Sequence, residues 1–265
     1  MNVLKCEFIK WKKSLSFKVT WFVVLCFSVL YGFMVAYSDD SYKGLDLMII
    51  SFSDSMLYII IGAVIAGLFI CNDFENRTFQ ESITCGNSHL SVIASKAFVY
   101  TLSAVAAYVH YPIISSIVVA AKYGWGFETA GASGVDFAVR MTLLMVSIFF
   151  SYLPMMMLFV MVCFFVQKTG ISFAINMPVM MIGIVVMQMI QKYLFPESEL
   201  YAKIYGYSFM GLFNMPFAYL GSSAENNLLV DVTLNNYLPI IGAGIAWAAL
   251  FFAIAAITFK KRDLK

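Results

Sequence analysis

The side chains that most often perform catalysis or hold metals are scarce in this chain. It has two histidines, His89 and His110, and five scattered cysteines: Cys6, Cys26, Cys71, Cys85 and Cys163. Neither H-E-x-x-H nor G-x-S-x-G occurs, the patterns of a zinc site and of an activated serine. A protein zinc site needs three or four ligands gathered together. We therefore expect no metal site and no catalytic residue, which disfavours an intramembrane enzyme.

A motif for binding the phosphates of a nucleotide is also missing from the sequence. The sequence has no G-x-x-x-x-G-K-[ST], so the chain cannot cradle the phosphates of ATP by itself. Its formal charge is only +2, which gives no reason to expect a nucleic acid or another polyanion as a partner. If ATP drives this protein, a separate subunit must bind and hydrolyse it.

The composition identifies the medium that surrounds the chain. Of its 265 residues 62% are hydrophobic and 12% are charged, and the mean hydropathy is +0.84. Soluble proteins are roughly 45–50% apolar and about 25% charged. The composition therefore predicts an all-α, polytopic membrane protein, with residues 1–265 forming one transmembrane domain.

A membrane-spanning helix needs about 20 mostly apolar residues. Six runs qualify, and His110 is the one residue inside them that is Asp, Glu, Lys, Arg or His. They are Val19–Ser38, Ser55–Asn72, Ala97–Ala121, Met141–Gln167, Thr169–Gln191 and Val232–Phe259. Only Lys168 separates the fourth run from the fifth, which predicts a tight turn between antiparallel helices.

The basic residues predict the orientation, because Lys and Arg concentrate in cytoplasmic segments. Both ends of the chain are basic, from Lys5 to Lys18 and from Lys260 to Lys265. We therefore expect an even number of spans and both termini in the cytoplasm. A seventh uncharged run, Ile204–Ala224, then falls in the extracytoplasmic loop 192–236. It is rich in glycine and contains Pro216, so we expect a re-entrant or outer-leaflet segment.

Residues 1–18 precede the first span and are patterned as a helix. Leu4, Phe8, Trp11 and Leu15 recur at helical spacing, and lysines lie off that stripe. A basic amphipathic helix of this kind lies in the membrane interface. It could serve as an orienting anchor or as a lever joined to a cytoplasmic partner.

The inner loop 72–96 is predicted to form a short amphipathic helix, a turn and the start of the third span. Phe79 and Ile83 are four residues apart and share a helix face. Gly86 suits a helix stop and Ser88 suits the N-cap of the next helix. We expect the inner leaflet or a docked protein to cover Phe79 and Ile83.

A few polar or helix-breaking residues interrupt the apolar runs. Asp54 falls near the outer end of the second span, where we expect it to be solvated. His110 lies well inside the third span, either as a neutral histidine hydrogen-bonded across a helix interface or on a translocation surface. The candidate residues for a translocation path or gate are His110, Pro112, Pro154, Asn176 and Pro178.

Together these elements resemble the transmembrane subunits of ABC exporters of the second permease type, which are related in fold to ABCG-type half-transporters. That family is similar in its basic amphipathic N-terminal helix, six spans, inner loop of the form Glu-x-x-x-Thr…Gly-x-Ser-Arg…Ser-Lys and basic tail. The matching residues are Glu75–Phe79, Gly86–His89, Ser95–Lys96 and Phe259–Leu264. His89 stands where the family usually has arginine.

The resemblance implies that loop 72–96 carries a coupling helix that docks on an ATP-binding subunit. The residues that would make this contact are Glu75, Arg77, Phe79, Glu81, Ile83, Gly86 and His89. It further implies two ATP-binding subunits, a second permease chain that is identical or related, and a bacterial cell membrane. ATP and magnesium would bind to the partner subunits, and no cofactor to this chain.

The Met- and Phe-rich interior and the family analogy favour an amphipathic or hydrophobic cargo, such as a peptide, bacteriocin or antibiotic, for export or self-immunity. Two alternatives stay open, a self-contained secondary transporter and a non-transporting membrane scaffold. Secondary transporters commonly carry charged residues at mid-membrane and repeated halves. The nearly uncharged spans of this chain disfavour ion coupling.

Overall fold

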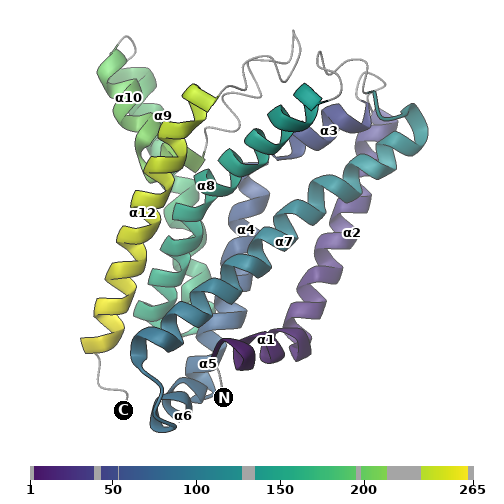
Figure 1. The fold of residues 1–265 in the computed structure, drawn as a ribbon. Helices are drawn as coiled ribbons and strands as arrows, with labels where there is room; N and C mark the ends of the chain where they lie inside the picture. Colours follow the sequence, from purple (N-terminus) through teal and green to yellow (C-terminus); the bar gives the residue numbers. More distant parts are fainter. Residues whose placement is uncertain are drawn as a thin grey trace.

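The computed structural model describes residues 3–38, 43–52, 54–126, 135–194, 198–213 and 234–261. Every regular element within those ranges is a helix, as predicted (Figure 1). The predicted all-α fold is therefore confirmed for the part of the chain that the structure describes.

Within the described residues, six helices are long and apolar enough to cross a membrane, which confirms the predicted number. Their spanning stretches are Leu15–Ser38, Met56–Glu75, His89–Tyr123, Met141–Val166, Thr169–Leu194 and Tyr237–Lys260. They belong in order to α2 (Leu15–Ser38), to α4 (Ser55–Ala66) with its continuations, and to α7 (His89–Tyr123), α8 (Val135–Val166), α9 (Thr169–Leu194) and α12 (Leu234–Lys261). The predicted turn at Lys168 is present, and Gln167 makes it with a φ of 59°.

Shorter helices lie at both ends of this bundle (Figure 1). At one end are α1 (Val3–Lys13), α5 (Asn72–Glu75) and α6 (Thr78–Thr84). At the other are α3 (Gly44–Ser51) and α10 (Glu199–Tyr207). The predicted N-terminal helix thus stops at Lys13, and Leu15 already belongs to the first span.

Four of the six spans pack as two close pairs, and α4 contacts α7, α8 and α9. Helix α2 lies along α7, where a Cβ on Gly32 would come within 2.8 Å of the Ser115 carbonyl oxygen. Helix α12 lies along α8, where a Cβ on Gly244 would collide with the Phe150 carbonyl oxygen. Glycine at these two positions therefore permits the close approach of each pair.

The predicted re-entrant segment Ile204–Ala224 is described only up to residue 213, and its remainder lies outside the described residues. The described part packs onto the last span. The Trp247 indole N–H donates to the Tyr207 carbonyl at 2.9 Å, and the rings of Phe209 and Phe251 are 5.3 Å apart. Its depth in a bilayer stays a prediction.

Candidate functional site

The segment Asn72–Ser88, here called the hairpin, joins the second span to the third and holds most of the residues predicted to contact a partner. It consists of α5, α6 and two connections that need unusual backbone. Arg77, between the helices, has a φ of 58°, and Gly86, after α6, has a φ of 85°. The Ser88 hydroxyl accepts the backbone N–H of Ser91 at 3.2 Å. The predicted helix stop at Gly86 and N-cap at Ser88 are confirmed.

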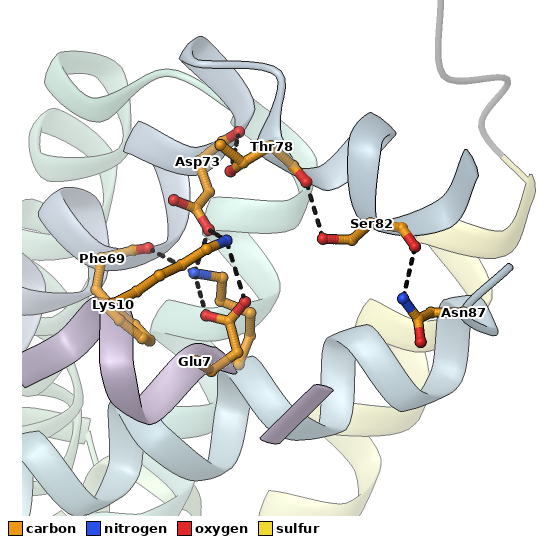
Figure 2. Close-up of polar contacts among 8 residues, drawn as sticks. Glu7, Lys10, Phe69, Asp73, Thr78, Ser82 and Asn87 are labelled. Atoms are coloured by element: carbon orange, nitrogen blue, oxygen red, sulfur yellow. Dashed lines mark hydrogen bonds and ion pairs between the residues drawn. The ribbon is translucent and has the colours of Figure 1, made fainter. Parts of the chain in front are cut away.

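Side-chain hydrogen bonds hold the hairpin closed (Figure 2). The Thr78 hydroxyl donates to the Asp73 carbonyl at 3.1 Å, and the Ser82 hydroxyl donates to the Thr78 carbonyl at 2.9 Å. The Asn87 amide then donates to the Ser82 carbonyl at 2.8 Å. These bonds give the short α6 a defined position, which a seven-residue helix could not keep alone.

An aromatic cluster, consisting of Phe74, Phe79, Phe164 and Phe259, seats the hairpin on the bundle. The rings of Phe74 and Phe79 stack at 4.1 Å, and Phe79 lies 5.6 Å from both Phe164 of α8 and Phe259 of α12. His89, the first residue of α7, lies edge-on to Phe259 at 5.5 Å. Three spans and the hairpin thus meet at one set of rings.

This cluster corrects one expectation. Phe79 was expected to need a cover from the leaflet or from another protein, but it is 2% exposed, because the chain's own rings cover it. Ile83 shares its face and also packs against the core. The sequence could not show this, since Phe164 and Phe259 arrive from distant helices.

A charge cluster lies beside the rings and consists of Glu7, Lys10, Asp73 and Lys96. Figure 2 labels the first three of these residues. The Lys96 ammonium pairs with the Glu7 carboxylate at 2.6 Å and also with the Asp73 carboxylate. The Lys10 ammonium lies 3.4 Å from each of the two carboxylates, so positive and negative groups alternate around the cluster. Lys96 is 1% and Glu7 2% exposed, so the centre of this network is inside the protein, whereas the Lys10 side chain is 39% exposed at its edge.

The irregular end of the second span takes part in the same network. Gly67–Cys71 forms a π-helical turn, a feature frequent at functional sites. The Phe69 carbonyl in this turn accepts the Lys96 ammonium at 3.4 Å, and the Phe69 ring lies 4.1 Å below it. Lys96 therefore has hydrogen-bond, ion-pair and cation–π partners in place of the water that it loses.

The electrostatics of the cluster are balanced, with two carboxylates and two ammonium groups. Burial alone would lower the pKa of Lys10, but the charges of Glu7 and Asp73 outweigh it, so this pKa is raised. Removing one member of a buried ion pair leaves a charge without compensation, at a cost of about 3–5 kcal/mol. The cluster therefore ties α1, α5 and α7 into one body.

The remaining predicted contact residues lie at the surface of the hairpin, except His89, which begins α7. Arg77, Glu81 and Gly86 are exposed and His89 is half-buried. Glu75 is exposed too, but its carboxylate accepts the backbone N–H of Thr169 at 2.8 Å. It thereby caps the start of α9, besides any contact with a partner.

At the opposite end of the bundle, the structure corrects the expected solvation of Asp54. This carboxylate is half-buried and accepts the Tyr111 hydroxyl at 2.6 Å. Burial raises its pKa, and the hydrogen bond from Tyr111 opposes that change.

The five candidate residues for a path or gate are not brought together. His110 packs against Trp21 of α2 at 4.9 Å, and its Nδ1 has no hydrogen-bond partner within the described residues. Pro112, Pro154 and Asn176 are buried in three different helices, and Pro178 is exposed. The Asn176 amide donates to the Ser172 hydroxyl at 3.1 Å within its own helix.

The sequence analysis missed Glu7, Lys10 and Asp73, and it treated Lys96 only as a family match and a cytoplasmic charge. A usable signal existed, since Glu7 is the one acidic residue in an otherwise basic N-terminal helix. Among the described residues, no three histidine, cysteine or acidic side chains gather as metal ligands would.

Comparison with known protein families gave a match. A family model described as "ABC-2 family transporter protein" matches residues 3–183, which include α1, the hairpin and the charge cluster. No curated protein matches the chain.

Proposed function

The chain belongs to the ABC-2 family of transporter proteins, and we propose that it is the membrane-spanning subunit of an ATP-driven exporter in which the hairpin receives force from a separate ATP-binding subunit. Membership of this family implies a permease without its own ATPase site, in line with the absence of a phosphate-binding loop from the sequence.

The observation that carries the proposal is the burial of the hairpin against several spans at once. The aromatic cluster connects α6 with α8 and α12, and the charge cluster connects α5 with α1 and α7. Packed interiors transmit displacement because they have little room to deform. A push on the hairpin would therefore move α1 and three spans together.

The surface of the hairpin that remains available to an ATP-binding subunit is polar. Arg77 and Glu81 are exposed on the hairpin while its apolar face is used internally. In this proposal the ATP-binding subunit recognises charges of the hairpin and does not cover Phe79. Two such subunits, carrying ATP and magnesium, would serve two permease chains, identical or related.

The orientation follows from the same proposal. The hairpin, α1 and the end of α12 lie at one end of the bundle (Figure 1), which would face the cytoplasm of a bacterial cell. The cargo would be an amphipathic or hydrophobic molecule such as a peptide, bacteriocin or antibiotic. The Met- and Phe-rich core of the described spans supports a cargo of this kind.

Co-purification tests the proposal. Tagged chain in mild detergent should retain an ATP-binding subunit, and the double variant Arg77→Glu with Glu81→Lys should lose it without loss of thermal stability. Lys203→Glu is a matched control, because Lys203 is exposed on α10 at the other end. Absence of any ATP-binding subunit from the unaltered chain, with ATP-independent efflux from liposomes that hold this chain alone, would favour a secondary transporter instead.

A further inference from the structure

The seam between α7 and α8 is hollow at membrane depth. One half-enclosed cavity of about 280 Å³ is lined from α7 by Val105, Tyr108 and Val109 and from α8 by Met145, Val146 and Phe149. A second, more open hollow of about 380 Å³ is lined by α7, α8 and Phe252 of α12, and Phe149 lines both. The α2–α7 pair and the α8–α12 pair are thus separated by unfilled space where they face each other.

The lining of the seam is apolar, and its hydroxyl groups donate to backbone carbonyls. The Tyr108 hydroxyl donates to the Tyr58 carbonyl and the Tyr152 hydroxyl donates to the Phe52 carbonyl. In the second hollow, the Thr101 hydroxyl donates to the Ala97 carbonyl. An apolar cavity of this kind does not hold water stably, and one of about 150 Å³ already accepts a benzene-sized hydrocarbon.

The seam opens sideways, between exposed side chains of α7 and α8. Val109 and Val146, which flank the first cavity, are each 38% exposed, and Phe98 and Leu102 beside the second are more exposed still. All four lie within spanning stretches, so their exposed surfaces face the hydrocarbon of a bilayer. The molecules available at this opening are lipid acyl chains.

We propose that the α7–α8 seam binds the acyl chain of a membrane lipid. A helix from another protein is about 10–12 Å wide and does not fit a cavity of this size, whereas a single hydrocarbon chain does. The chain lies between the two helix pairs, contacts Val109 and Val146 at the entrance and reaches toward Tyr108 and Tyr152. The acyl chain then fills the space that the side chains of α7 and α8 leave empty.

Photo-cross-linking tests this site. The protein is extracted in mild detergent so that bulk lipid is removed, with a trace of phospholipid carrying a diazirine in its acyl chain. Labelled peptides should come mainly from residues 105–109 and 145–156. Filling the entrance from either side, by Val109→Trp or by Val146→Trp, should remove most of that labelling.

Val186→Trp is the matched control, since Val186 is 44% exposed on α9 and lines neither hollow. It should leave the labelling of the seam unchanged. Two entrance variants on separate helices guard against the misfolding of one of them, which thermal unfolding would reveal. Labelling spread evenly over all lipid-facing helices, and unaltered in two folded entrance variants, would overturn the proposal. The outcome does not depend on an ATP-binding subunit.

Discussion

The Lys96 ammonium lies 2.6 Å from the Glu7 carboxylate, and this pair joins two distant parts of the chain. Lys96 belongs to α7, the third span, and Glu7 belongs to α1, the N-terminal helix. Both side chains are almost fully buried. The pair therefore fixes α1 to the bundle, and this helix is more than a floating interfacial anchor.

Removing the ammonium should release α1. We expect Lys96→Met to lower the free energy of unfolding by about 3–5 kcal/mol, because Glu7 and Asp73 lose their central cation. Glu7→Gln should be damaging as well, and the double variant should cost less than the sum of the two. Unfolding in detergent, followed by far-UV circular dichroism, measures all three. Lys18→Met, at an exposed position of α2, should change stability by less than about 0.5 kcal/mol. Equal effects at positions 18 and 96 would refute the structural role of the cluster.

Truncating the central ring of the aromatic cluster should loosen the hairpin. Phe79→Ala removes a buried ring that touches three others, and such substitutions cost about 3–5 kcal/mol. Limited proteolysis after Arg77 would detect the loosened hairpin directly. Phe22→Ala should leave proteolysis unchanged, since Phe22 is 65% exposed in a span. A stable Phe79→Ala variant that only loses its partner would show that the ring serves docking after all.

The turn after α6 needs a residue that tolerates positive φ. Gly86→Ala should destabilise the protein by about 1–2 kcal/mol through backbone strain alone, because no atom lies within 4 Å of the added Cβ. Gly170→Ala adds a Cβ into equally open space, but within α9, where alanine is favoured over glycine by about 0.5–1 kcal/mol. The two substitutions should therefore shift the melting temperature in opposite directions. Matching shifts would argue against the positive φ of Gly86.

Asp54 should make stability depend on pH. Because burial raises its pKa, the folded state favours the protonated acid. Its contribution to stability is present below the ordinary value of 3.8 and is lost as pH rises through the raised value. At neutral pH, Asp54→Asn should thus melt at a higher temperature than the unaltered chain, since asparagine still accepts the Tyr111 hydroxyl. The difference should shrink in acid, and a difference that is constant between pH 4 and 8 would disprove this assignment.

Local chemistry explains what the sequence analysis predicted correctly. Six apolar runs must become spanning helices, because lipid leaves their backbone no other hydrogen-bond partners. Gly86 and Ser88 act on their immediate neighbours, so their roles as helix stop and cap can be inferred without any tertiary contact. The turn at Lys168 follows from the length of the gap alone.

What failed depended on partners that are distant in sequence. The burial of Phe79 requires Phe259, which only the last span brings to the hairpin. Lys96 looked like an orienting charge because nothing local marks Glu7 and Asp73 as its partners. We expected Asp54 to be solvated because the sequence does not reveal its contact with Tyr111. That contact depends on how α4 packs against α7.

The central claim is that the hairpin faces the cytoplasm and binds an ATP-binding subunit there. Cys85 is exposed on the hairpin, and Cys71 and Cys163 are buried. In a Cys6→Ser, Cys26→Ser variant, a membrane-impermeant maleimide should label Cys85 in inside-out vesicles but not in intact cells, and the bound ATP-binding subunit should shield it. Lys203→Cys, at the other end, should show the reverse accessibility when Cys85 is also replaced by serine. Labelling of Cys85 in intact cells would place the hairpin outside and contradict the account.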